Sequence, residues 1–154
     1  MIMARLTGND TPTPGKSYAI HEYPINPNDD WAGALTVYSK FHARPGEVYF
    51  SHWEQHPHQV FVCVEKDGWL GFICRASPAG EHGAYLGYDN YEKIICKAQY
   101  QQKWEDMTFI KRESGGFEWL MRKDDHLAYV GFIGGNGLGI LRDFTRPWGF
   151  TELK

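Results

Sequence analysis

The sequence predicts an all-β fold, and three observations support that prediction. No window of about a dozen residues keeps apolar side chains at the i, i+3, i+4, i+7 spacing of an amphipathic helix. Glycine and proline interrupt the chain often, with 17 Gly and 8 Pro among 154 residues. Short runs rich in β-branched and aromatic residues follow one another, and turn residues close each run. The length fits one domain with a core of its own.

The runs predict twelve strands along the chain. Each contains apolar side chains that fit a pleated, half-buried surface, and Gly, Pro, Asn or Asp residues separate one run from the next. The expected strands are Ser17–Tyr23, Ala34–Ser39, Glu47–Trp53, Val60–Glu65, Trp69–Arg75, Ala84–Asp89, Lys93–Gln99, Met107–Glu113, Phe117–Lys123, Leu127–Phe132, Leu138–Phe144 and Phe150–Lys154.

A weak internal repeat organises these strands. Similar segments begin at Val60, Met107 and Phe150 at nearly equal spacing, and the last two follow a tryptophan, Trp104 and Trp148. Three units of that size, each with four strands, fill most of the chain. We therefore expect threefold pseudo-symmetry in a single domain over residues 15–154, preceded by a flexible N-terminal arm over residues 1–14.

Short segments add a resemblance to a known family. Pro14–Ile20 and Pro147–Phe150 resemble the opening and closing strands of small mushroom β-trefoil proteins, which are lectins and protease inhibitors. Gln102–Trp104 resembles the Gln-x-Trp signature of ricin-B-type trefoil lectins, although it occurs once here rather than three times. The resemblance implies a β-trefoil of twelve strands in three four-stranded pseudo-repeats, with sugars bound in loop pockets.

Composition narrows the classes of partner. The formal net charge of −3 gives no basic face for nucleic acid, so we expect no nucleic-acid partner. No apolar run reaches the length of a membrane span, so we expect no membrane insertion. The N-terminus lacks the apolar region of a signal peptide, and the three cysteines lie in apolar runs, which predicts buried thiols and a cytoplasmic location.

Loop residues give the candidate ligand site. Sugar hydroxyls bind carboxylate and amide groups, and the C–H face of a sugar packs on an aromatic ring. Three loop clusters offer such groups, although Asp and Asn are also the ordinary residues of turns. The candidate ligand-binding residues are Asp30, Trp31, His82, Asp89, Asn90, Tyr91, Asp125, His126 and Asn136.

The sequence analysis therefore predicts a non-enzymatic lectin that serves in defence and binds glycans or glycoproteins without a cofactor. Because single trefoil sites are weak, several sites or a homodimer would supply avidity. A protease inhibitor acting through a protruding loop, Pro24–Asn28, is the main alternative. A cupin-like metal enzyme is the third hypothesis, with His56, His58 and His82 as ligands, although the carboxylate spacing departs from the cupin pattern. An actin-bundling role like that of fascin, which uses four such domains, is weaker still.

Overall fold

The computed structural model describes residues 5–25, 33–39, 41–135 and 137–154. Within these residues the chain forms twelve strands and two short 3-10 helices, and it contains no α-helix. None of the described helices is long and apolar enough to cross a membrane. The elements are β1 (Ser17–Glu22), β2 (Gly33–Val37), β3 (Val48–His52), η1 (Pro57–Gln59), β4 (Phe61–Lys66), β5 (Trp69–Cys74), β6 (Ala84–Tyr88), β7 (Ile94–Ala98), η2 (Lys103–Glu105), β8 (Met107–Lys111), β9 (Phe117–Lys123), β10 (His126–Gly134), β11 (Gly137–Leu141) and β12 (Trp148–Leu153).

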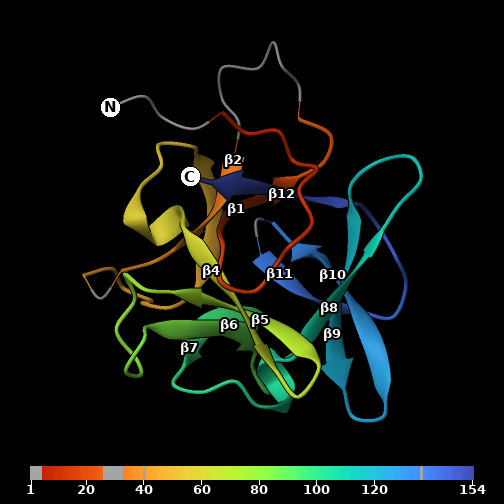
Figure 1. Cartoon of the computed structure of the whole chain (residues 1–154). Helices are drawn as coiled ribbons and strands as arrows, with labels where there is room; N and C mark the ends of the chain where they lie inside the picture. The colour runs from red at the N-terminus through yellow and green to blue at the C-terminus, as the bar shows by residue number, and fades with distance from the viewer. Residues whose placement is uncertain (1–4, 26–32, 40, 136) are drawn as a thin grey trace.

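Six of the strands close into a barrel. Strand β1 pairs with β4, β4 with β5, β5 with β8, β8 with β9, β9 with β12, and β12 again with β1, all antiparallel. In Figure 1 the last strand, β12, accordingly lies beside β1. Because the ring is closed, none of these six strands leaves a free edge along the barrel.

The other six strands form three hairpins, β2–β3, β6–β7 and β10–β11. Each hairpin follows a barrel strand and pairs with it, so the same four-strand unit occurs three times. Bridges from Glu47 to Ile95 and from Lys93 to Gly139 join neighbouring hairpins. A six-stranded barrel with three such hairpins is the β-trefoil fold, and the predicted all-β class, strand number and threefold repeat are confirmed.

Aromatic rings fill the barrel. Phe150 stacks on Phe72 with ring centroids 5.8 Å apart, and Trp119 meets Trp148 edge-on at 5.8 Å. Trp148 is fully buried, and its indole nitrogen donates to the carbonyl of Val130 at 2.9 Å. Of the residues that the strand pattern places in the core, Val62, Phe72, Leu86, Ile94, Leu120 and Ile140 are buried, whereas Leu70 and Phe109 are partly buried and pack against the core. The three cysteines are free and buried.

The register of the barrel shows which residues correspond between units. The pairs that close each unit are Tyr18–Phe61, Leu70–Met107 and Phe117–Trp148. Trp148 therefore corresponds to Met107 and not to Trp104, so the alignment of the two tryptophans was wrong. Trp104 lies on η2 and is 47% exposed, whereas Trp148 begins β12 in the core.

The segment before β1 lies along β12. Leu6 is buried, the backbone of Asn9 forms a parallel bridge with Phe150, and Asp10 accepts a hydrogen bond from the backbone N–H of Glu152 at 2.8 Å. These contacts attach the described part of the expected arm to the barrel. Its flexibility stays a prediction, since only hydrogen exchange or relaxation measurements report on it.

Candidate functional site

A large cavity lies where the second unit meets the third. Its volume is about 860 Å³, and it opens between the β4–β5 turn, the connection that contains η2, and β9. We call it the Trp69–Trp104 cavity. Its lining residues are Lys66, Asp67, Trp69, Gln101, Gln102, Lys103, Trp104, Glu105, Asp106 and Arg122.

Asp106 fixes the floor of the cavity. It directly precedes β8, and its carboxylate is 5% exposed. One oxygen accepts from the Arg122 guanidinium at 3.0 Å and the other accepts from the Gln101 amide at 3.1 Å. The backbone N–H of Arg122 also donates to the carbonyl of Asp106 at 3.0 Å. Both oxygens of the buried carboxylate are therefore satisfied, as burial of a charge requires.

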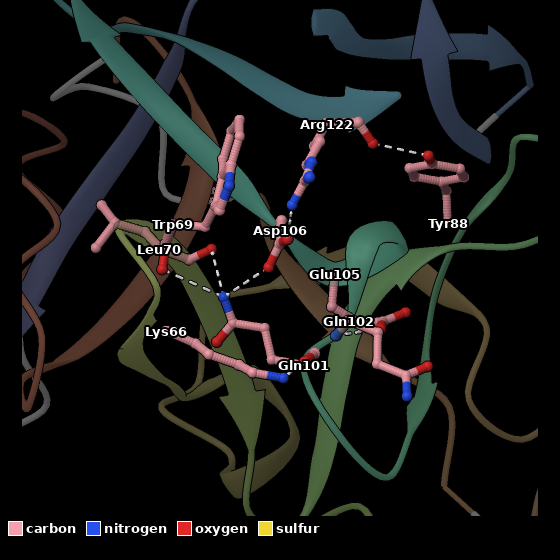
Figure 2. A network of polar contacts seen from close by, with 9 residues as sticks. All are labelled: Lys66, Trp69, Leu70, Tyr88, Gln101, Gln102, Glu105, Asp106 and Arg122. Carbon is pink, nitrogen blue, oxygen red and sulfur yellow. Dashed lines mark hydrogen bonds and ion pairs between the residues drawn. The ribbon is translucent and has the colours of Figure 1, made fainter. Parts of the chain in front are cut away.

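Gln101 holds the aromatic wall in place. Its side-chain nitrogen lies 3.2 Å from the carbonyl oxygens of both Trp69 and Leu70, besides its bond to Asp106 (Figure 2). The backbone carbonyl oxygen of Gln101 accepts a hydrogen bond from Lys66 Nζ at 2.8 Å. The absence of a side chain at Gly71 makes this possible, because a Cβ there would lie 3.0 Å from the Gln101 amide. The network ties the start of β5 to the connection before β8.

The helix η2 packs closely on β6. Glu105 accepts from the backbone N–H of Gln102 at 2.9 Å, which closes the first turn of η2. A Cβ at position 87 would lie 2.6 Å from the carbonyl of Trp104, so only Gly87 permits this approach. Burial raises the pKa of the Glu105 carboxyl, and the hydrogen bond from Gln102 opposes that change.

Trp104 is the exposed aromatic of the cavity. Its ring stacks on Tyr88, with centroids 5.6 Å apart and an interplanar angle of 23°. The Tyr88 hydroxyl donates to the carbonyl of Arg122 at 2.7 Å, and burial raises the pKa of Tyr88 to about 12, so the donor stays protonated (Figure 2). The Arg122 guanidinium lies 5.1 Å from the Trp69 ring centre. The Trp104 ring therefore rests on Tyr88, and the hydrogen bond from Tyr88 to Arg122 holds Tyr88 in place.

This combination occurs in the second unit alone among the described residues. In the first unit Ser17 and Val60 take the places of Trp69 and Asp106, so both the indole and the carboxylate are missing. In the third unit Gly116 takes the place of Trp69. There Tyr23 takes the place of Arg122, and its ring would meet a Cβ at Gly116 at 2.8 Å. Tyr23 therefore fills the corresponding space.

The second predicted loop cluster lies at the β6–β7 turn and the β5–β6 connection. Asp89 uses one carboxylate oxygen to accept from the backbone N–H groups of Tyr91 at 2.9 Å and Lys93 at 3.0 Å, so it stabilises the turn. Tyr91 is 82% exposed and Asn90 is exposed as well. His82 is exposed and lies 3.9 Å from Glu81. No hydrogen bond or ion pair between described residues joins His82 to the turn.

The third cluster lies at the β9–β10 turn. The Asp125 side chain is fully exposed and lies 3.4 Å from His126 Nδ1. His126 lines a cavity of about 530 Å³ together with Glu92 of the second unit. Lys123 and Glu92 form an ion pair at 3.7 Å across the same boundary. The structure thus places His126 beside the preceding unit, and sugar binding by these residues stays a prediction.

Three candidate residues lie outside the described part of the chain. These are Asp30, Trp31 and Asn136. Most of the proposed inhibitor loop lies outside it too, because only Pro24 and Ile25 are described. Ile25 packs against the small cluster formed by Leu6, Ala19, Ala34 and Trp53. Protease inhibition through this loop stays a prediction.

The three histidines of the metal hypothesis do not form a group suited to a metal ion, although His56 and His58 lie side by side. His56 precedes η1, where its Nδ1 accepts from the backbone N–H of His58 at 3.1 Å, and the two rings stack at 5.4 Å. His82 belongs to the exposed connection after β5. The described residues hold no group of three His, Cys, Asp or Glu side chains suited to a metal ion. Since the fold is a trefoil, the cupin-like interpretation loses its structural basis.

The sequence analysis did not select the residues of the Trp69–Trp104 cavity as a site. Gln102 and Trp104 appear there only in a family-like motif, Trp69 and Arg122 lie in predicted strands, and Asp106 falls just before the predicted strand Met107–Glu113. A signal was present in Asp67-Gly68, a dipeptide that favours a tight hairpin and places the flanking residues opposite each other. Lys66 and Trp69 do pair across this turn.

Comparison with solved structures finds β-trefoil proteins, and two of them are structures with a bound saccharide. The Vibrio vulnificus hemolysin/cytolysin β-trefoil lectin with bound N-acetyl-D-lactosamine superimposes with a TM-score of 0.68 at 11% identity, covering 92% of this chain and 98% of that one. SeviL bound to the asialo-GM1 saccharide gives 0.61 at 14% identity, covering 91% and 99%.

A third structure is the GlcNAcα1-4Gal-releasing endo-β-galactosidase from Clostridium perfringens. It gives a TM-score of 0.66 at 11% identity and covers 90% of this chain but 33% of that one. At these identities the likeness establishes the fold alone. No family model matches the sequence. No curated protein matches it either.

Proposed function

We propose that this protein is a non-enzymatic lectin that binds a glycan in the Trp69–Trp104 cavity. The observation that carries the proposal is an exposed indole set beside polar groups in a cavity of about 860 Å³. Trp104 offers a flat apolar face, and the cavity wall offers Arg122, Gln102 and Lys66 as hydrogen-bond donors. A sugar ring needs both kinds of surface.

Rigidity of the site favours binding. Trp104 rests on Tyr88, and Tyr88 is tied to Arg122, which in turn is held by Asp106. A preformed site of this kind loses little conformational entropy when a ligand binds. Known β-trefoil lectins such as the Vibrio vulnificus protein and SeviL bind saccharides on the same fold, which adds support at the level of architecture.

The polar groups of the cavity favour binding over catalysis. The two buried carboxylates, Glu105 and Asp106, both accept hydrogen bonds from within the protein. A general acid or base must instead reach the proton that it transfers. Because the cavity occurs in one unit, we also propose one site of this kind per chain, rather than the several sites that the sequence suggested.

The proposal is tested with a glycan array followed by isothermal titration with the best monovalent glycan. Two exposed aromatics serve as matched variants: Trp104→Ala removes the cavity platform, and Tyr91→Ala removes the aromatic of the β6–β7 turn. We expect Trp104→Ala to weaken binding at least about tenfold, equivalent to about 1.4 kcal/mol, and Tyr91→Ala to leave it unchanged. Both should keep the melting temperature within about two degrees, since their rings are exposed.

The other outcomes identify the alternatives. Loss of binding in Tyr91→Ala with normal binding in Trp104→Ala would move the site to the β6–β7 turn, where the sequence analysis placed it. If no glycan binds at millimolar concentration while a protease is inhibited at sub-micromolar concentration, the lectin proposal is wrong and the inhibitor function replaces it.

A further inference from the structure

The charges that line the Trp69–Trp104 cavity differ in their access to solvent. The carboxylates of Glu105 and Asp106 belong to buried residues, 7% and 5% exposed. The cations are more accessible: Lys66 and Lys103 are exposed, and the Arg122 side chain is 32% exposed. A ligand entering the cavity therefore meets cationic groups before it meets the buried acids.

The two buried acids contribute little negative charge at the cavity surface. Asp106 is paired with Arg122 and also accepts from Gln101, so its charge is compensated inside the protein. Glu105 accepts from the Gln102 backbone, and burial raises its pKa toward the neutral form. Asp67 is the one exposed carboxylate among the described lining residues, whereas two lysines of the lining, Lys66 and Lys103, are exposed.

Neither lysine forms an ion pair with a carboxylate among the described residues, although the charge of Lys66 acts on Glu105 and partly opposes the rise of its pKa. Lys66 Nζ donates to the Gln101 carbonyl, which leaves two of its three N–H donors. No ion pair between described residues involves Lys103. Arg122 contacts Asp106 through one terminal nitrogen, so further N–H donors of its guanidinium remain.

We infer that the glycan bound in this cavity is acidic and carries a carboxylate or a sulfate ester beside its apolar ring face. The anionic group would lie among Lys66, Lys103 and Arg122, while the sugar ring packs on Trp104. Arginine and lysine bind such oxyanions by charge-assisted hydrogen bonds, which are shorter and stronger than those between neutral groups. This inference rests on the proposed function and names the class of ligand for the same site.

The test uses matched pairs of monovalent glycans that differ only in the acidic group: a sialoside and its carboxamide, a uronic acid and the parent hexose, and a 6-sulfated and the unsulfated sugar. Isothermal titration at low and at physiological ionic strength should show at least about a tenfold preference for one acidic member, reduced by salt. The carboxylate pairs and the sulfate pair separate the two sources of negative charge.

Variants locate the preference in the cavity. The double variant Lys66→Gln/Lys103→Gln should reduce the ratio of the affinities for the acidic and the neutral member of a pair at least about fivefold. Lys111→Gln, an exposed lysine at the opposite end of β8, is the control and should leave the preference unchanged. Acidic and neutral members binding equally would overturn the inference while the lectin proposal stands. A preference that survives the double variant would overturn it too. If neither class binds, both proposals fall.

Discussion

His21 is a buried histidine that the fold holds in the neutral form. It is 0% exposed, and its ring lies between Gly8, in the segment that precedes β1, and Gly149 of β12. The hydroxyl of Thr151 accepts from the backbone N–H groups of Thr7 at 2.9 Å and Gly8 at 2.8 Å, so its own proton is directed to His21 Nε2, 2.8 Å away. Nδ1 then donates to the carbonyl of Glu22 at 2.9 Å. Protonation of Nε2 would place its N–H against the hydroxyl proton of Thr151.

Lowering the pH should therefore destabilise the protein through this one side chain. Burial lowers the pKa of His21 from 6.5 to about 4, while the hydrogen bond to Glu22 opposes the shift. The folded state favours the neutral ring, so its stability is intact above pH 6.5 and falls as the pH drops toward 4. At 1.36 kcal/mol per pKa unit, the loss is about 2 kcal/mol at pH 5 and about 3 kcal/mol at pH 4.

Urea unfolding followed by tryptophan fluorescence between pH 7 and pH 4 measures this loss. His21→Gln keeps an amide oxygen that accepts from Thr151 but has no titrating group. Between pH 7 and pH 4 the free energy of unfolding should therefore fall about 3 kcal/mol less in this variant than in the wild type. His126→Gln, at an exposed histidine, should follow the wild type. Parallel curves for wild type and His21→Gln, within about 0.5 kcal/mol, would refute the role of His21.

Two further predictions concern stability. Trp148→Ala should lower the free energy of unfolding by about 3–5 kcal/mol and Trp104→Ala by about 1 kcal/mol or less, because only the first ring is in the core. Equal costs in urea denaturation would mean that the correspondence between the units is misassigned. Gln59→Ala should cost about 2–4 kcal/mol, because the buried amide makes four hydrogen bonds, one each to β2 and β3 and two to the connection between β3 and η1. A cost below about 1 kcal/mol in thermal or urea unfolding would show that those groups find other partners.

The fold could be predicted because its signals are local. Turn residues separate twelve short apolar runs, and each run became a strand with ends displaced by a few residues. The repeat was visible for the same reason, since each unit buries a similar face. The alignment of Trp104 with Trp148 as corresponding residues of two units was wrong, because residue type alone does not give the strand register. Trp104 lies on η2 and stacks on Tyr88, whereas Trp148 begins β12 and is fully buried.

The site was harder to predict because its groups come together only through that register. Asp106 precedes β8 and Arg122 lies near the end of β9, and their contact depends on the antiparallel pairing of the two strands. Asp89 shows the reverse case. An acidic residue in a loop suggested a ligand contact, but its oxygen is committed to two backbone N–H groups of its own turn. Sequence alone does not distinguish these two uses of a carboxylate.

The closed barrel also has a consequence for chain connectivity. Because β12 pairs with β1, the gap between the last strand and the first corresponds to the β4–β5 and β8–β9 turns of the other units. Ser17 at the start of β1 pairs with Leu153 near the end of β12, so a peptide joining these two residues would span a short distance at small entropic cost. Opening the chain instead at Ser114–Gly115 would then reorder the units without changing a single strand pair. The three units could therefore follow one another in any of three cyclic orders along the chain and still form the same barrel.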